Sequence, residues 1–184
     1  MSTRVRSVGA LLACAVLLGL AGCANGRHSA APTAAPTRWP AGVAGGACQL
    51  LDFDVVAAAV GVSFDVAAAS QQGGTYTCVL QQQQSSFPDL TLAVTATAAD
   101  VNTFRSTVTP KGAATVSDLG RAGYSTTVPA SGGAGPAIEV GWLAGNARLL
   151  VLRYRLAPGA DPAPLAALTP KVVELARKVD LYSA

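Results

Sequence analysis

The N-terminus of the chain determines which part of it is available to form a folded domain. Arg4 and Arg6 precede an apolar run from Val8 to Leu20. This run is shorter than the about 20 apolar residues that a helix needs to cross a bilayer. A basic start followed by a short apolar segment is instead typical of a secretory signal peptide. We therefore expect residues 1–22 to be a signal peptide that is removed, and the rest of the chain to fold outside the cytoplasm.

The end of this segment carries a second signal. Leu20, Ala21, Gly22 and Cys23 resemble the lipobox of bacterial prolipoproteins, and the resemblance implies that Cys23 receives a diacylglyceryl thioether and becomes the N-terminus. An ordinary secretory signal with a chance cysteine is the alternative. Two or three acyl chains, at ~0.8 kcal/mol per buried CH₂, hold a protein firmly on a membrane. The expected location is the extracytoplasmic face of the cell membrane, with the membrane as a partner through the lipid anchor.

The composition changes after the lipobox. Residues 24–47 are rich in Ala, Pro, Thr and Gly, with prolines at 32, 36 and 40, which is typical of a tether. The single histidine, His28, lies here and is interpreted as a solvated linker residue. We therefore divide the chain into a signal peptide at 1–22, a lipidated cysteine and tether at 23–47, and one globular domain at 48–184.

The cysteines agree with an exported domain. Cys14 leaves with the signal peptide and Cys23 takes the lipid, so Cys48 and Cys78 remain. Two thiols in an oxidising compartment are expected to form a disulfide. A zinc site is the alternative, but the two cysteines lack the C-x-x-C spacing and the domain contains no histidine. We expect no metal and no cofactor.

Hydrophobic periodicity and turn residues outline the secondary structure. Asp52, Asp161 and a capping box of Thr97 and Asp100 are expected to start three helices, and Pro170 is expected to kink or split the last one. The expected elements are a helix at 52–61, strands at 75–82 and 89–97, a helix ending before 110, strands at 124–128, 138–143 and 148–156, and a helix from 161 onward. Without repeated crossovers, this order predicts an α+β fold with an antiparallel sheet of about five strands, three helices packed on it and one disulfide.

The final hairpin allows two registers. A two-residue turn at Gly145 and Asn146 makes both sheet faces apolar, whereas a three-residue turn that includes Ala144 separates the charges from the core. We expect the second register. It places Trp142 on one face with Leu150, Leu152 and Tyr154, and gathers Glu139, Arg153 and Arg155 on the other face.

Several short motifs of the domain resemble those of small lipoproteins of actinobacteria, of the mycobacterial type, with a two-cysteine domain of unknown function. The matching positions are Cys48, Leu51, Gly61, Cys78, Val116, Leu119, Gly120, Ala122 and Gly145. The resemblance covers most of residues 48–184, and it implies a location and a two-cysteine fold but no chemistry.

The domain lacks the parts that common catalytic sites need. It has no histidine for a Ser-His-Asp or Cys-His site, and both of its cysteines are assigned to the disulfide. Glu139 lies inside an expected strand, where we expect a surface ion pair with Arg153 or Arg155. Four of the 13 basic residues precede residue 48, whereas all ten acidic residues follow it, so the domain has no excess of positive charge and no concentrated basic face for a nucleic acid. We expect a protein that is not an enzyme and does not bind nucleic acid.

Two functions that do not require catalysis remain. The first is binding of an apolar or amphipathic envelope molecule, such as a lipid or glycolipid, in a pocket lined by Trp142, Leu150, Leu152 and Tyr154. The second is docking on another envelope protein through an exposed sheet face or edge. An open apolar cavity favours the first function, and a filled core favours the second.

Overall fold

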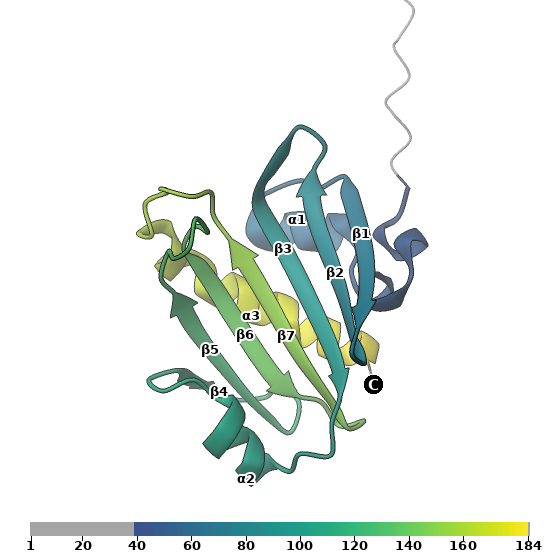
Figure 1. Ribbon diagram of the computed structural model, residues 1–184, viewed down its shortest axis with the longest axis vertical. Coiled ribbons are helices and arrows are strands. Elements are labelled where there is room, and N and C mark those ends of the chain that lie inside the picture. The colour runs from purple at the N-terminus through teal and green to yellow at the C-terminus, as the bar shows by residue number, and fades with distance from the viewer. Residues whose placement is uncertain (1–38, 184) are drawn as a thin grey trace, which may run out of the picture. The chain divides into compact units, whose positions relative to one another are not determined.

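The computed structural model describes residues 39–183, which form one antiparallel sheet with helices on it (Figure 1). The sheet has seven strands in the order β1-β2-β3-β7-β6-β5-β4. The α+β fold is confirmed, and the strand number is seven where the sequence suggested about five. Residues 1–38 and 184, with the signal peptide, Cys23 and most of the expected tether, lie outside the described residues.

The elements follow one another along the chain without a parallel crossover. They are the 3-10 helices η1 (Ala41–Ala44) and η2 (Gly46–Leu50), helix α1 (Phe53–Val60), strands β1 (Val66–Gln72), β2 (Thr75–Gln82) and β3 (Ser85–Ala96), helix α2 (Val101–Thr103) with the π-helical turn η3 (Phe104–Val108), strands β4 (Ala114–Val116), β5 (Ala122–Val128), β6 (Ala137–Leu143) and β7 (Arg148–Arg155), and helix α3 (Pro164–Ser183).

The two strands absent from the sequence prediction, β1 and β4, are the edges of the sheet. Strand β1 has the sequence Val-Ala-Ala-Ala-Ser-Gln-Gln and is exposed along most of its length. An edge strand of this kind buries neither face, so its sequence carries no alternation of apolar and polar residues. Strand β4 has only three residues, too few for a period to show.

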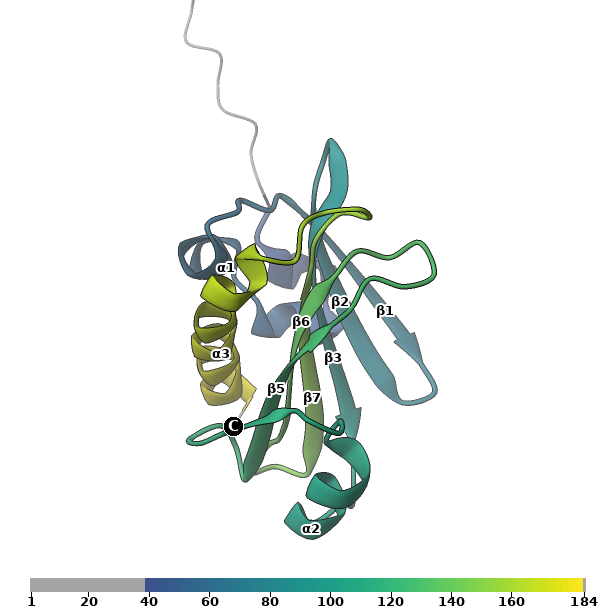
Figure 2. The same cartoon turned by 90° about the vertical axis from the view of Figure 1, so that its left-hand side faces the viewer.

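The helices cover one face of the sheet. Helices α1 and α3 lie together on the same side, as Figure 2 shows, and the main core fills the space between them and the sheet. The segment α2–η3 instead packs against Tyr124 and Leu143 through Phe104, at one end of the opposite face. The middle of that opposite face has no helix over it (Figure 2).

The expected helix starts are confirmed in part. Asp52 Oδ1 accepts the N–H groups of Asp54 and Val55 at 2.9 and 3.0 Å. The second helix is capped by Asp100 alone, which accepts the Thr103 N–H at 2.7 Å, so the capping box with Thr97 is wrong. Hydrogen bonds from the backbone and from the side chain of Thr103 lower the pKa of the Asp100 carboxyl.

The last helix also differs from expectation, because α3 runs through Pro170 without splitting. Asp161 accepts the Ala163 N–H ahead of the helix at 2.9 Å. Thr169 does not act as a second cap, since its hydroxyl donates to the Leu165 carbonyl one turn earlier at 2.9 Å. No helix among residues 39–183 has both the length and the apolar character needed to cross a membrane.

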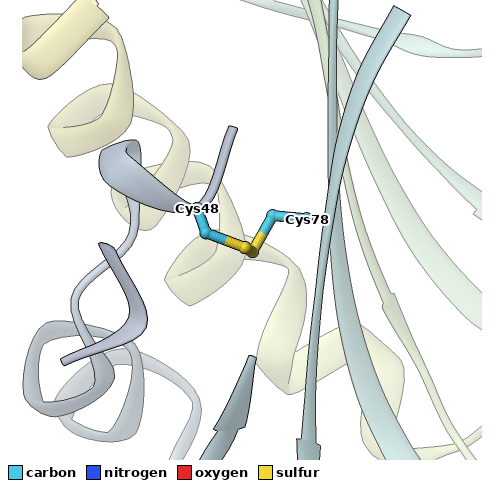
Figure 3. Close-up of a disulfide and its surroundings, with 2 residues drawn as sticks. All are labelled: Cys48 and Cys78. Carbon is cyan, nitrogen blue, oxygen red and sulfur yellow. A yellow bond between two sulfur atoms is a disulfide. The ribbon is translucent and has the colours of Figure 1, made fainter. Parts of the chain in front are cut away.

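The disulfide between Cys48 and Cys78 is confirmed and joins η2 to β2 (Figure 3). Both cysteines are fully buried. Ala41 and Ala47 are also buried in the main core. The folded domain therefore begins before the expected boundary at residue 48, and residues 41–47 do not belong to a tether.

The final hairpin has the expected faces but a different loop. Trp142 pairs with Leu150, and the Ala144 N–H still donates to the Arg148 carbonyl at 2.9 Å, so the loop is formed by residues 145–147. Ala144 stays out of the loop because it is buried against the core. The left-handed conformation then falls on Ala147, with φ at 59°.

Candidate functional site

The four residues expected to line an apolar pocket lie together, but they are part of the core. Trp142, Leu150 and Leu152 have no exposed surface, and Tyr154 is 2% exposed. The Trp142 indole N–H donates to Asp180 Oδ1 on α3 at 2.8 Å, which fixes the helix over the sheet. The cavities described below are lined by other residues, so nothing in this cluster is open to a ligand.

The opposite face of the sheet carries a buried carboxylate. Glu139 on β6 is 8% exposed, and it accepts the Tyr124 hydroxyl at 2.8 Å and the Arg153 Nε–H at 3.0 Å. Arg153 Nη2 donates to the same carboxylate oxygen as Nε. The expected ion pair is thus confirmed with Arg153, but its acidic member is buried rather than on the surface.

The tyrosine of this group keeps its proton. Burial raises the pKa of the Tyr124 hydroxyl well above its ordinary value, and the hydrogen bond to Glu139 raises it further. A protonated hydroxyl is a hydrogen-bond donor and not a base. Tyr124 therefore acts as a fixed donor that satisfies one oxygen of Glu139.

A second arginine is held in the same way two residues further along β7. Arg155 donates from Nε and Nη2 to Asp89 Oδ2 at 2.9 and 2.6 Å, and Asp89 is 1% exposed. The guanidinium also lies over the Phe87 ring, 5.3 Å from its centroid. Asp89 is the first residue of the strand expected at 89–97. No local signal links it to Arg155, because the pair is 66 residues apart and depends on β3 lying next to β7.

The two arginines line one hollow on the uncovered face. Its other lining residues are Thr91, Ala93 and Val151, and its volume is about 300 Å³. Thr91 lies opposite Arg153 in the sheet, and its hydroxyl is 3.5 Å from Asp89 Oδ1. The hollow therefore has a floor of small uncharged side chains and a rim with two guanidinium groups.

A different surface lies at the β1 edge of the sheet. Strand β1 has seven residues, none of them charged. Three of the large apolar side chains that are exposed in the described chain lie on or near this edge, namely Val43, Val66 and Tyr76. Val66 is on β1, Tyr76 is on the neighbouring β2 opposite Gln71, and Val43 is on η1, which contacts β1.

A cavity of about 430 Å³ lies between η2 and the strands β2, β3 and β7. Its lining includes Gly46 and Leu50 of η2, Tyr76 of β2 and Arg148 of β7. Gly46 approaches the Ala69 side chain of β1, because a Cβ atom added there would be 3.9 Å from the Ala69 Cβ. Segment η2 therefore packs close to β1 at Ala69, while the cavity itself opens over the neighbouring strands.

Comparison of this chain with protein-family models, curated proteins and solved structures finds no match.

Proposed function

We propose that this protein is a lipid-anchored lipoprotein of the cell envelope that has no enzymatic activity and docks on another envelope protein. In this proposal, an extended segment of the partner adds to strand β1 as a further strand of the sheet. The observation that carries the proposal is the edge formed by β1, whose seven residues are uncharged and mostly exposed. The lipobox at residues 20–23 supports the location.

The two edges of the sheet differ in a way that favours pairing at β1. Proteins usually protect an edge strand by making it very short, by charging it, by placing a proline in it or by covering it. Strand β4 has three residues, whereas β1 has seven and contains no charge and no proline. Backbone groups along such an edge can accept an extended peptide through strand addition.

The chemistry around β1 indicates the kind of segment that fits. Strand β1 itself carries no charge, and the nearest charged residue in the sequence is Asp65. Asp65 lies just before β1 and accepts the Gln83 N–H at 2.7 Å. The exposed apolar residues beside the edge favour apolar contacts. The partner segment is therefore extended and apolar, and a charged residue of the partner that lies beside Asp65 would be basic.

Binding of a lipid or glycolipid in the core has less support. That function requires an open pocket at Trp142, Leu150, Leu152 and Tyr154, and these side chains are buried among the other core residues. A filled core favours docking over ligand binding.

Site-specific photocrosslinking in the native membrane tests the docking proposal. A photoreactive residue is placed in the full-length chain at Ala68 or at Ser70, whose exposed side chains lie on one face of β1. We expect one crosslinked protein from both positions. The crosslinked residue in that protein should shift by two positions between the two experiments, because paired strands keep register.

The control positions are Ala166 and Ala167, which are exposed on α3 away from the edge. Replacing Ala68 and Ser70 together by lysine should reduce co-purification of the crosslinked protein by about tenfold or more, whereas the same double replacement at Ala166 and Ala167 should not. Crosslinks without the two-residue shift, crosslinks to a second copy of this chain, or no crosslink at all would each overturn the proposal.

A further inference from the structure

The uncovered face of the sheet carries a feature that docking at β1 does not use. Arg153 and Arg155 are two residues apart on β7, so their side chains leave the strand on the same side. Both line the hollow of about 300 Å³ in the middle of this face. Because like charges at this separation repel each other, other groups must offset the repulsion between the two guanidinium groups.

Buried carboxylates hold both arginines in place. Glu139 takes the Nε and Nη2 groups of Arg153, and Asp89 takes the same two groups of Arg155. The acid side chains are 10% and 1% exposed, while those of Arg153 and Arg155 are 45% and 33% exposed. A group that approaches from solvent therefore meets the guanidinium groups first, with the carboxylates behind them.

Each guanidinium keeps part of its hydrogen-bonding capacity. The pair with the carboxylate uses the Nε–Nη2 edge, and among residues 39–183 no hydrogen bond is made by Nη1 of either arginine. The Nη1–Nη2 edge of a guanidinium forms the fork that binds two oxygens of an anion at once. Since the other edge is already fixed, little rotamer freedom remains to be lost when an anion binds.

We propose that Arg153 and Arg155 form a binding site for the oxyanion of a phosphate ester in this hollow. Two forks supply up to four donors, which suits the tetrahedral oxygens of a phosphate, whereas a carboxylate with two oxygens is satisfied by a single fork. The five lining residues include no acid. The carboxylates of Glu139 and Asp89 lie behind the arginines at 10% and 1% exposure, where they accept from the Nε–Nη2 edges and leave the Nη1 groups to an anion. The phosphate belongs either to a soluble ester or to a lipid headgroup, and both sources offer the same group. This site is independent of the β1 edge.

Modification of arginines by phenylglyoxal, measured residue by residue by mass spectrometry, tests this site in the full-length chain. In dodecyl maltoside micelles, sn-glycerol 3-phosphate should slow the modification of Arg153 and Arg155 by about fivefold or more. Arg148 is an internal control, because it is exposed on the same strand but lines the cavity beside Tyr76 instead. Sodium chloride at equal ionic strength should give no comparable protection.

A second arm of the experiment distinguishes a soluble phosphate ester from a lipid headgroup as the source of the phosphate. The protein is placed in bilayer discs of phosphatidylglycerol without any soluble ester. Protection of both arginines there assigns the site to a lipid headgroup, and protection only by the soluble ester assigns it to a soluble ligand. Absence of protection in both arms, or equal protection of Arg148, would overturn the proposal.

Substitutions show whether the two arginines share one anion. Arg153→Gln should reduce the protection of Arg155 by the ester about fivefold or more, because one fork is removed. The matched variant Arg148→Gln should leave that protection unchanged. Unchanged protection of Arg155 in Arg153→Gln would mean that no anion is shared, which contradicts the site. Should Arg153→Gln fail to fold, the protection of Arg153 and Arg155 from phenylglyoxal in the chain without substitutions still decides the outcome.

Discussion

Gly120 lies where the chain passes close to the hairpin between β6 and β7. Its φ angle is +54°, and a Cβ atom at this position would lie 2.5 Å from the Leu143 carbonyl oxygen and 3.1 Å from the Trp142 ring. Its N–H donates to Asp180 Oδ2 on α3 at 3.2 Å. Asp180 thus holds both Gly120 and Trp142, and only glycine fits between the loop and the sheet.

Gly120→Ala is expected to lower the free energy of unfolding by about 2 kcal/mol or more, since it combines backbone strain with a clash against the backbone. Gly112→Ala is the matched control, because Gly112 has a φ of +81° but no atom within 4 Å of an added Cβ. Gly112→Ala should lower the free energy of unfolding by only about 1 kcal/mol, because it adds backbone strain without a clash. Urea denaturation measures both values, and equal losses would contradict the close approach at Gly120.

Tyr124 gives an expected pH dependence at the residue scale. Burial and then the hydrogen bond to Glu139 raise its pKa in the folded protein above the ordinary value for tyrosine. The stabilisation is therefore present in full below about pH 10, where the unfolded chain still keeps this proton. Above that pH the unfolded chain loses the proton first, so stability falls as the pH rises.

The measurement is the slope of unfolding free energy against pH between about pH 10 and 11. Tyr124→Phe should make this slope shallower by the equivalent of up to about one proton released on unfolding. The variant also removes the hydrogen bond to Glu139. Burial raises the pKa of Tyr154 too, so a residual slope is expected in the variant. An unchanged slope would contradict the raised pKa of Tyr124.

At the scale of elements, strand β7 separates the core from the charged face. Leu152 is fully buried and pairs with Leu92 and Val140, while its neighbour Arg153 pairs with Glu139 on the other side. Alternation along one strand therefore places an apolar residue and an ion pair only one position apart.

Leu152→Asp is expected to unfold the domain, because an unpaired buried carboxylate costs several kcal/mol of a total stability of about 5 to 15 kcal/mol. Arg153→Ala should cost only about 1 to 2 kcal/mol, because Glu139 keeps its hydrogen bond from Tyr124 and becomes more accessible to water. Circular dichroism and denaturation midpoints compare the two variants. A larger loss for Arg153→Ala would mean that the faces of β7 are reversed.

The elements predicted correctly are those with strong local patterns. Helix α1 has an N-cap, an apolar stripe and a glycine at its end, and β7 is a long apolar run that ends in the alternating residues Leu152, Arg153, Tyr154 and Arg155. The predicted loop of the final hairpin was misplaced by one residue, because the burial of Ala144 fixes the start of the loop at residue 145. The Asn146 side chain also donates to the Ser183 carbonyl at the end of α3, which is a contact that no local pattern shows.

At the scale of the whole molecule, the lipobox leads to a prediction about anchoring. Cys23 lies outside the described residues, so the test is chemical. Cys23→Ser should abolish lipidation and leave unprocessed precursor, because the thioether forms on this side chain. Intact-mass analysis of the membrane fraction measures the acyl mass and the position of the mature N-terminus. A mature N-terminus at another residue, without acyl mass, would contradict the lipobox interpretation.

The sequence by itself determined the properties that depend on neighbouring residues or on residue chemistry. These include the α+β class, the cap of α1, the disulfide between Cys48 and Cys78 and the two faces of the final hairpin. Periodicity, capping and cysteine pairing carry this information because the geometry of a helix or strand repeats over a few residues, and because only two thiols remain in the domain.

Only the tertiary structure decided the strand order and therefore the surfaces. It placed β3 beside β7, which joined Asp89 to Arg155, and it left β1 at one edge of the sheet. It also filled the space around Trp142, Leu150 and Leu152 with α3, so that the expected pocket is core. Contacts between residues far apart in the chain depend on how elements pack, and no local periodicity records that packing.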